Sequence, residues 1–577
     1  DLKFKSNLGV EYHGWNDREK TTFDQVRYLE VSNYENMLTE RRGDFTTLIL
    51  ENTLTYNKKI EKHAFDLLAG YTAQETKWKQ MTSTVHDLVP GFWVLSAGKE
   101  DIVVSGNDSE YAMLSMLGRI NYAYDDKYLV QANVRRDGSS RFGANYRYGI
   151  FPSASLGWRA SQENFFEGAR KYIDDLKLRA SYGTIGDQQT IGDYDYSTYI
   201  SVGEGGIFGA DQVLNVGAIQ KGRSNPNLRW ESKTTLNLGV DFSALNNRLY
   251  GSLEYFSANS KDILVKLPIS WTDGTDITPW TNFGKVNNQG FELTIGFKEQ
   301  SKDFKYNASL NITSVKNKVL ELGQSYREGG SNGVNRSEEG RSVGDFYVVR
   351  TDGIFQNWDE VYAHTYTTTD ADTGAETTTL IQPNAKPGDI RYKDINNDGQ
   401  INKDDREFIG SPFPDYEVGL QFSCEYKNFD LSMFMTAVAG NMIYSNTKYW
   451  LERMDETSNL PAGLQPWTEQ NHSTTTPRAV MGPNENTLSY SDRWIEKGDY
   501  VRMKNLQLGY NFPKNMLKQT KVVESCRLFA GVQNLFTLTK YSGYDPEISG
   551  GDIFGKGNDN GHFPPVRSFN AGVQISF

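Results

Sequence analysis

The sequence predicts an all-β protein, a transmembrane antiparallel β-barrel to which this chain contributes roughly 16 strands. Three observations predict this fold. Side chains alternate between apolar and polar with a period of two residues, aromatic residues and glycine are abundant, and connections alternate between long and short. Of the 577 residues, 33 are Tyr, 30 are Phe and 53 are Gly, whereas hydrophobic residues make up only 37%. This composition favours sheets with one wet face over a large soluble core of Leu, Ile and Val.

The period-two pattern locates the strands, because successive side chains of a strand point to opposite faces of a sheet. Within residues 416–426 every second residue is apolar or aromatic, and polar residues or Gly stand between them. The last strand places Phe569, Val573 and Ile575 on one face, and Asn570 and Gln574 on the other. The strands predicted in this way are 2–14, 45–57, 63–78, 112–124, 127–136, 148–160, 175–187, 228–244, 249–262, 288–298, 303–318, 416–426, 430–445, 493–512, 526–541 and 566–577.

The connections between these strands differ in length in a regular way. Long connections are predicted at 15–44, 79–111, 188–227, 263–287, 319–415 and 446–492. The short ones are 58–62, 125–126, 246–248, 299–302 and 427–429. A β-meander that crosses a membrane has tight turns on one side and large loops on the other. Alternating strands alone are more often those of a soluble sandwich or propeller, but the alternation of loop length and the absence of a fixed repeat favour the barrel.

Several classes of protein are disfavoured by the composition. The net charge of −12 makes nucleic acid an improbable partner, because a phosphate binder needs a basic surface. Cys424 and Cys526 fall three predicted strands apart, too far for a disulfide. The sequence contains no run of ~18 apolar residues, so no transmembrane helix is predicted. A membrane-crossing strand needs only ~10 residues of alternating polarity. No general acid–base pair or nucleophile arrangement stands out, so we do not expect an enzyme.

One short stretch does not read as strand. In "DINNDGQINKDD", residues 394–405, oxygen-bearing residues recur at alternate positions and Gly399 stands where a calcium loop turns sharply. The expected Ca²⁺ ligands are Asp394, Asn396, Asp398, the backbone carbonyl of Gln400, and Asp405. The alternative is a plain turn, because Asn, Asp and Gly favour turns without any metal. Asp405 is shorter than the Glu that usually closes such a loop, which weakens the predicted affinity.

Two further sets of residues are candidates for binding. Five tryptophans lie in or beside the long connections, where they could stack on sugar rings or grip a partner, or else pack inside folded loops or form an interfacial aromatic girdle: Trp271, Trp280, Trp358, Trp450 and Trp467. The charged stretch "RRDGSSR" could reach the lumen or mouth, but a self-paired or solvated cluster is the expectation for Arg135, Arg136, Asp137 and Arg141. No substrate-binding residue is predicted.

Seven stretches of the chain, taken together, resemble a known family. The resemblance is carried by "SMLGRINYAYDDKYLVQANVRRDGSSRFG" (115–143), "FPSASLGWRASQENFF" (151–166), "IDDLKLRASYGTIGDQ" (173–188), "NNQGFELTIGF" (287–297), "GDIRYKDINNDGQINKDDREFIGSPFPDYEVGL" (388–420), "YVRMKNLQLGYNFP" (500–513) and "FAGVQNLFTLTKYSGYDPE" (529–547). In this order they resemble the SusC/RagA-like TonB-dependent outer-membrane transporters of Bacteroidetes, and the resemblance covers essentially the whole chain.

The resemblance implies a multi-pass barrel of about 22 strands in the cell outer membrane, with an amino-terminal plug in its lumen. It also implies energisation through TonB, a SusD-like surface lipoprotein as a lid, and import of oligosaccharides or peptides. A dimer of transporter–lipoprotein pairs is a further possible assembly. We expect residues 1–577 to be a partial barrel that lacks the plug and the first strands, so that the strands at 2–14 and 566–577 pair with strands outside this sequence.

The expected orientation follows from the carboxyl end of the chain. If residue 577 ends in the periplasm, every long connection is extracellular, and the longest, 319–415, carries the calcium-type loop. Two other functions stay open at this point. One is a passive porin, without plug or lid, and the other is a secreted calcium-dependent glycan-binding protein or adhesin, which would not show the heat-modifiable gel migration of a barrel.

Overall fold

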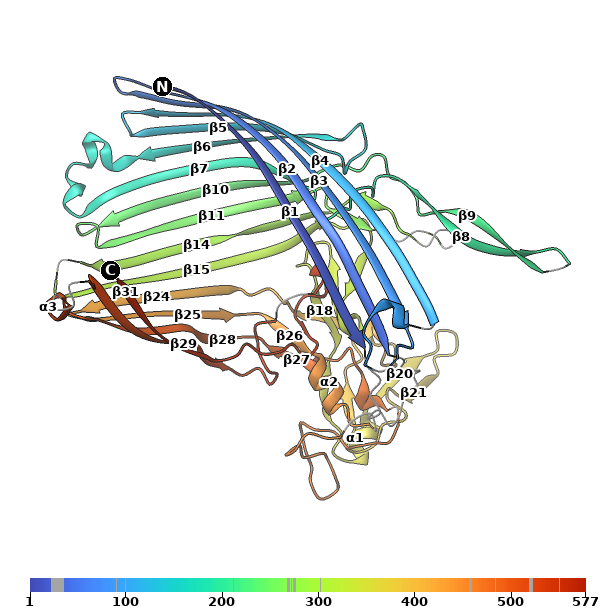
Figure 1. Ribbon diagram of the computed structural model, residues 1–577. Coiled ribbons are helices and arrows are strands. Elements are labelled where there is room, and N and C mark those ends of the chain that lie inside the picture. Colours follow the sequence, from blue (N-terminus) through green and yellow to red (C-terminus); the bar gives the residue numbers. More distant parts are fainter. Residues whose placement is uncertain are drawn as a thin grey trace. The chain divides into compact units, whose positions relative to one another are not determined.

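The computed structural model describes residues 1–21, 36–89, 91–98, 100–210, 212–266, 270, 272, 277–300, 302–455, 459–482, 484–517, 522–548 and 551–577 (Figure 1). Among these residues no helix has the length and apolar character needed to span a membrane. The main sheet contains sixteen strands, hydrogen-bonded in the order β1 (Leu2–Thr21), β2 (Met37–Ile60), β3 (His63–His86), β4 (Glu100–Tyr124), β5 (Tyr128–Ser139), β6 (Tyr148–Arg159), β7 (Ile173–Asp187), β10 (Glu231–Ala244), β11 (Leu249–Lys261), β14 (Lys285–Glu299), β15 (Phe304–Glu321), β24 (Tyr416–Tyr426), β25 (Phe429–Ala439), β28 (Tyr500–Asn511), β29 (Ser525–Thr539) and β31 (Ser568–Ser576).

Each of the sixteen predicted strands is present, so the all-β fold is confirmed, but several bounds were wrong. β1 continues to Thr21 and β2 begins at Met37, where the sequence predicted 14 and 45. These extensions were missed because most of their side chains are charged or polar, so the apolar alternation stops while the backbone ladder continues. β25 ends at Ala439 rather than 445, because residues 442–445 leave the main sheet and pair elsewhere.

The chain divides into two compact units, which we describe separately. The first comprises residues 1–159, 179–236 and 260–284, and the second residues 160–178, 237–259 and 285–577.

In the first unit the strand register separates an apolar face from a polar one. Residues that stand opposite one another across β1 to β6 form one lateral row, namely Leu8, Leu50, Ala73, Leu114, Gly138 and Tyr148. The row one residue away faces the other side and is polar, namely Asn7, Glu51, Thr72, Ser115, Asp137 and Gly149. The apolar face is exposed, as expected of a surface that contacts lipid.

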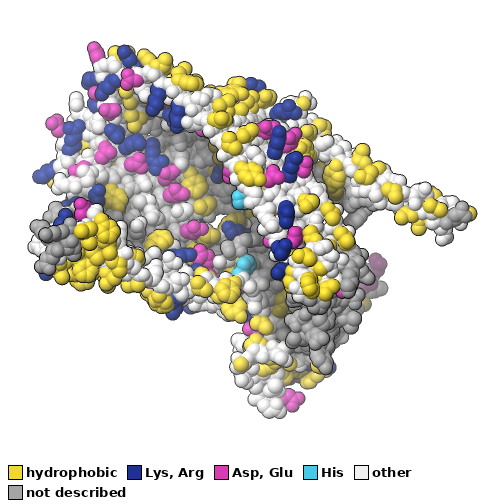
Figure 2. Space-filling view, in the orientation of Figure 1, with side chains coloured by type: hydrophobic (Ala, Val, Ile, Leu, Met, Phe, Trp, Pro, Cys, Tyr) yellow, Lys and Arg dark blue, Asp and Glu magenta, His cyan; other side chains and the backbone are white. Residues whose placement is uncertain are grey.

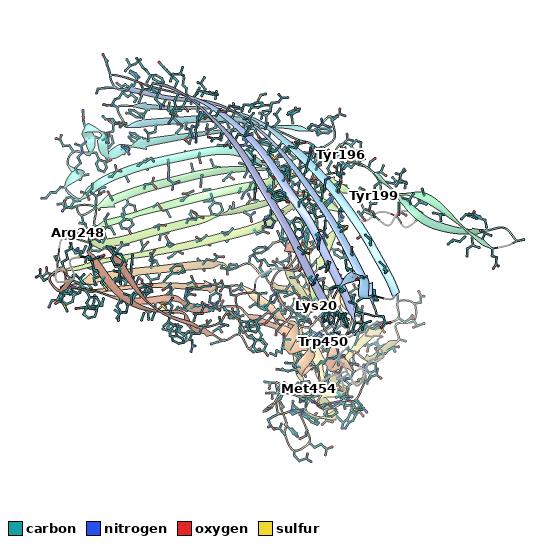
Figure 3. All side chains as sticks on the ribbon, viewed as in Figure 1. Lys20, Tyr196, Tyr199, Arg248, Trp450 and Met454 are labelled. Carbon is teal, nitrogen blue, oxygen red and sulfur yellow. The ribbon has the colours of Figure 1, made fainter. Side chains whose placement is uncertain are left out.

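The first unit also has a small buried core and a projecting hairpin. The core consists of Phe142, Phe151, Ile191, Leu228, Trp230 and Leu264. The hairpin, β8 (Tyr199–Phe208) and β9 (Val213–Lys221), is a separate two-stranded sheet, and Tyr199 is labelled at its start in Figure 3. It lies within the predicted long connection 188–227 and shows that this connection is folded.

The second unit repeats the separation of faces. One row across β15, β24, β25, β28, β29 and β31 is Tyr306, Cys424, Leu431, Leu508, Ala530 and Ala571. The adjacent row on the opposite face is Asn307, Ser423, Ser432, Gln507, Gly531 and Asn570. Cys424 and Cys526 lie in β24 and β29, three strands apart, and both are free thiols, as predicted.

Aromatic side chains gather where strands meet the short turns. In the first unit Tyr124 and Tyr128 flank one such turn, with ring centroids 6.3 Å apart. In the second unit the Phe304 and Tyr426 rings are 6.3 Å apart, and the Phe429 and Tyr510 rings 4.9 Å. Such clusters are typical of the aromatic girdles that border the apolar band of outer-membrane barrels.

The two faces of the last strand allow a direct test of lipid contact. Val573 lies opposite Leu528 on the apolar face and is 59% exposed, whereas Gln574 lies opposite Arg527 on the polar face. An arginine on the lipid face costs about 2–4 kcal/mol near the bilayer midplane. We therefore expect Val573→Arg to reduce the amount of heat-modifiable, folded protein in the outer membrane far more than Gln574→Arg. Equal loss in the two variants would contradict the assignment of the faces.

Candidate functional site: the loop assembly

Three long connections of the second unit fold together, and we call residues 322–415, 440–499 and 540–567 the loop assembly. Its largest sheet has the order β16 (Tyr326–Gly329), β17 (Asn335–Glu338), β18 (Asp345–Val349) and β23 (Arg406–Gly410). Another has the order β27 (Ile495–Lys497), β26 (Met442–Ser445) and β30 (Asn558–Asp559). Two-stranded sheets join β19 (Thr351–Ile354) to β22 (Ile390–Tyr392) and β20 (Thr365–Thr369) to β21 (Glu376–Leu380).

The loop assembly has a hydrophobic core of its own. The buried residues of its main cluster are Val334, Phe346, Val348, Tyr444, Tyr449 and Trp494. They come from two of the three connections, which are far apart in the sequence. Tyr449 lies in α2 (Asn446–Glu452), and its ring packs edge-on against Trp494 with centroids 5.4 Å apart. These two connections therefore share one packed core.

Buried hydrogen bonds tie the third connection to the first. The Nδ2 of Asn558 donates to Oδ1 of Asn335 at 2.6 Å, and both residues are buried. The backbone N–H of Ser331 donates to Oδ1 of Asn558 at 2.9 Å. Because an unpaired buried amide costs free energy, these side chains specify one arrangement of the two connections.

A buried arginine attaches the third connection to the main sheet. The guanidinium of Arg502, in β28, donates to Asp545 and to Glu547, each at 2.6 Å, and to Thr537 at 2.9 Å. Its side chain is 1% exposed. Removing either partner of a buried ion pair leaves a charge without compensation, so this contact sets the position of residues 540–567 over β28.

A second buried ion pair joins the first and middle connections. Arg478 donates to both carboxylate oxygens of Asp389, at 2.7 and 2.9 Å, and the amide of Asn486 donates to the same carboxylate at 2.9 Å. Burial raises the pKa of Glu485 nearby, while its hydrogen bond from Gln382 lowers it, and the Asp389 carboxylate adds to the rise.

The calcium-type loop lies between β22 and β23 and is closed by its own hydrogen bonds. The backbone N–H groups of Asp398 and Gly399 donate to the two carboxylate oxygens of Asp394, at 3.2 and 2.8 Å. The N–H groups of Ile395 and Asn402 donate to the two oxygens of Asp405, at 2.9 and 2.8 Å. Asp394 thus closes the first half of the loop, and Asp405 joins its two ends.

The structure brings part of the predicted ligand set together. Asn396 donates to Asp398 at 2.9 Å, and the N–H of Gln400 donates to Asp398 at 2.9 Å. Within the described residues, no group of three or more His, Cys, Asp or Glu side chains is placed to hold a metal ion. The hydrogen bonds match the plain-turn alternative, and they also hold Asp394, Asn396 and Asp398 on one turn.

Gly399 and Asp405 show how the loop is fixed in place. Gly399 has φ +82°, and a Cβ there would lie 2.6 Å from the Tyr366 ring, so only glycine fits. Asp405 is fully buried, and its burial raises the pKa of this carboxyl, with a smaller contribution from the charge of Asp394.

The tryptophans considered above have different environments. Trp467 is buried and donates from Nε1 to Gln356 at 3.2 Å, and Trp280 packs against the core of the first unit, so both are structural. Trp358, in α1 (Trp358–Ala363), is 48% exposed and stacks on Tyr362 at 5.7 Å. Trp450, in α2 and labelled in Figure 3, is 46% exposed. Trp271 lies outside the described residues.

The "RRDGSSR" stretch is partly self-paired, as predicted. Arg135 donates to both oxygens of Asp137, at 2.6 and 2.8 Å, and Arg141 donates to Asp193 at 2.9 Å. Arg136 differs, because its side chain lies on the opposite, apolar face and stacks over Tyr148. Sequence reasoning grouped the arginines together, although their alternation along one strand was the signal that separates them.

The chain was compared with known proteins. Residues 1–535 match the family described as "TonB dependent receptor-like, beta-barrel". Relatives include TonB-dependent receptor P3 of Formosa agariphila, 31% identical over 92% of this chain and 52% of that protein, and TonB-dependent receptor SusC of Bacteroides thetaiotaomicron, 29% identical over 100% and 54%. The chain therefore spans about half the length of these curated relatives. The "Structure of the RagAB peptide transporter" is similar over 100% of this chain and 60% of that one, with a TM-score of 0.81 and 25% identity.

Asp345, at the start of β18, gives the loop assembly a testable pH dependence. Burial raises the pKa of its carboxyl to about 6, against hydrogen bonds from Ser411 and Ser342 that lower it. Because the folded carboxyl keeps its proton to a higher pH than the unfolded one, its contribution to the free energy of unfolding is highest below about pH 4, falls as pH rises to about 6, and is constant above that.

We expect Asp345→Asn to flatten this pH dependence and to stabilise the loop assembly at pH 7.5 by about 1–2 kcal/mol, a value reduced for partial solvent exposure. Hydrogen exchange of the amides in β18 and β23, followed from pH 4 to 7.5, measures the effect. The exposed Asp372→Asn is the matched control and should behave as the unmodified protein does. A variant at position 345 with an unchanged pH profile would disprove the role of this carboxyl.

Proposed function

The chain belongs to the TonB-dependent receptor-like β-barrel family, a family of outer-membrane transporters and receptors, and on this premise we propose that it is the barrel part of an active nutrient importer. The proposed importer takes up oligosaccharides or peptides, is energised through TonB, and works with a SusD-like surface lipoprotein as its lid. The match along residues 1–535 is the observation that carries this proposal. The plug and the energy-coupling segment of this proposed importer would belong to the rest of a longer protein.

The loop assembly supports a role in capturing large substrates at the cell surface. A passive pore needs only loops that leave its mouth open. In this chain three long connections contribute to the loop assembly, which has its own hydrophobic core and buried ion pairs. That body presents the exposed, stacked rings of Trp358 and Tyr362. Flat aromatic faces of this kind can pack against a sugar ring, a peptide side chain or the lid.

The similarity to the RagAB peptide transporter and to SusC supports a two-component importer, in which the lid is a separate lipoprotein. The name of the RagAB peptide transporter states a peptide cargo, and the family that the sequence resembles imports oligosaccharides or peptides, so the proposed substrate class includes both. Dimerisation of transporter–lipoprotein pairs is part of the same proposal. The mass of the purified complex measures whether it contains one pair or two.

Energy-dependent uptake tests this function. We expect cells that carry the full-length protein to accumulate a labelled oligosaccharide or peptide mixture, and an uncoupler or loss of TonB to abolish that uptake. The double variant Trp358→Ala, Tyr362→Ala should reduce uptake while folded barrel is retained in the membrane. Purification of the tagged protein should bring down one surface lipoprotein. Uptake that continues with an uncoupler present would point to a passive porin, and binding of glycan without uptake to an adhesin.

We also propose that the loop at 394–405 binds one structural Ca²⁺ through Asp394, Asn396, Asp398, the Gln400 carbonyl and Asp405. The fit is supported by the turn that already holds the first three side chains together, and each carboxylate oxygen that accepts one N–H keeps a lone pair for a cation. Bound Ca²⁺ would offset the repulsion between Asp394 and Asp405 and brace the loop against β20. No transport step passes through the ion.

Hydrogen exchange of residues 394–405 tests the calcium proposal. At a Ca²⁺ concentration about ten times the dissociation constant, exchange in the full-length protein should slow about tenfold relative to a chelator. Asp398→Ala should remove this effect and leave the barrel assembled, whereas Asp404→Ala, at an exposed neighbouring position, should retain it. Identical exchange with and without Ca²⁺ in the unmodified protein would disprove the site.

A further inference from the structure

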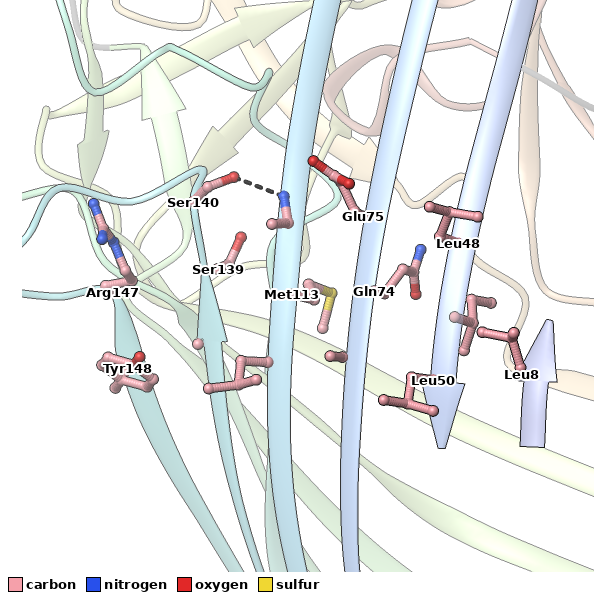
Figure 4. A pocket seen from close by; sticks show the side chains of 15 residues that line it. Leu8, Leu48, Leu50, Gln74, Glu75, Met113, Ser139, Ser140, Arg147 and Tyr148 are labelled. Atoms are coloured by element: carbon pink, nitrogen blue, oxygen red, sulfur yellow. Dashed lines mark hydrogen bonds between the residues drawn. The ribbon is translucent and has the colours of Figure 1, made fainter. Parts of the chain in front are cut away.

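The apolar outward face of the first unit is hollowed over β1 to β6. A groove of about 440 Å³ is lined there by apolar side chains of one lateral row, among them Leu8, Leu50, Ala73, Leu114 and Tyr148 (Figure 4). A second hollow of about 590 Å³ lies on the same face, nearer the short turns, and includes Leu54, Ala69, Gly118, Ala132 and Val134. Both lie on the face that the family places in lipid.

Small residues create the upper groove. Ala73, Ala112 and Gly138 stand between the larger side chains of neighbouring strands. A Cβ at Gly138 would lie 2.3 Å from the Tyr148 ring, so any larger residue there would displace the ring that forms one wall. The groove is therefore a consequence of the small size of these residues.

One arginine stands at the edge of this groove. The Arg136 guanidinium lies 4.1 Å from the centroid of the Tyr148 ring, which forms one wall of the groove. Within the part of the chain that the structure describes, this guanidinium has no acidic partner. Glu75, which also lines the groove, is paired with Lys77 at 3.0 Å, so its charge is compensated. The uncompensated charge at the groove is positive.

The position of Arg136 along its strand places it near the outer edge of the apolar band. It follows the girdle residue Tyr128 by eight residues, or about 27 Å of strand, which at the usual tilt of barrel strands is about 20 Å of height. The apolar band of such barrels is about 25 Å tall, and an arginine can extend its charged end beyond the edge. Beyond this level the same face becomes charged, with Lys77, Lys79 and Asp108, and Figure 2 shows blue and magenta side chains along these strands.

We propose that this groove is a binding site for one phosphate-bearing, acylated lipid of the outer leaflet, with an acyl chain against the Leu50–Ala73–Leu114 row and the phosphate held by Arg136. The guanidinium fork matches the oxygens of a phosphate, and the alkyl chain fills a hollow that protein side chains leave open. The lower hollow on the same strands continues the path of the chain toward the bilayer midplane.

The site is tested with the full-length protein in nanodiscs, with lipid A as the probe and phosphatidylethanolamine as the bulk lipid. Native mass spectrometry counts the lipid A molecules retained per protein. We expect Arg136→Gln to weaken retention about tenfold, because charged hydrogen bonds to phosphate are lost. Lys58→Gln is the matched control, because Lys58 lies on the same face at the opposite end of the strands, and it should leave retention unchanged.

A second measurement needs no change in the protein. Lipid A from which the phosphates have been removed should be retained about tenfold less well than the intact lipid by the unmodified protein. Ala73→Leu, which fills the groove and keeps Arg136, should also reduce retention. Equal retention of the phosphorylated and dephosphorylated lipids, or retention by the arginine variant equal to that by the Lys58 variant, overturns the proposal. Free phosphate that competes as well as the lipid would show a simple anion site and also overturns it.

Discussion

The pairing of every backbone polar group with a neighbouring strand, on a sheet with one apolar face, is the constraint on which the rest of this molecule depends. In hydrocarbon an unpaired N–H or C=O costs several kcal/mol, so the ladder must continue from strand to strand without a gap. The strand registers keep the two faces separate. The row that contains Leu431 and Leu508 is apolar across the six strands β15, β24, β25, β28, β29 and β31, and the row one residue away is polar or glycine. A shift of one residue in any strand would exchange the two faces.

This constraint explains what could be predicted from sequence. Alternation with a period of two is a local signal, and it located all sixteen strands of the main sheet. It failed where the signal stops but the ladder continues, as in β1 beyond residue 14, whose side chains are charged on both faces. It also failed at residues 442–445, which the sequence assigned to the end of the preceding strand of the main sheet but which pair with β27 and β30.

The loop assembly was predicted only as long connections, because the contacts that fold it are not local. Asn335 and Asn558 meet across more than two hundred residues, and neither carries a sequence signal that points to the other. Arg502 sits in a strand whose pattern predicts nothing about a buried ion pair with Asp545. The calcium-type loop was found from its spacing, since all its candidate oxygens lie within twelve residues, but spacing alone did not reveal that backbone N–H groups already occupy the carboxylates of Asp394 and Asp405.

The shared core of the loop assembly has a consequence for how such a protein can change over evolutionary time. A surface loop that folds alone can be exchanged or lengthened without regard to its neighbours. Here β26 pairs on one edge with a strand of its own connection and on the other with β30 from the next, and Tyr444 packs in a cluster with Val334 of a third. A substitution in one connection therefore alters the packing of the others. New specificity is easier to acquire at exposed side chains, such as Trp358, or by replacement of the whole loop assembly. It is harder to acquire by altering one connection at a time.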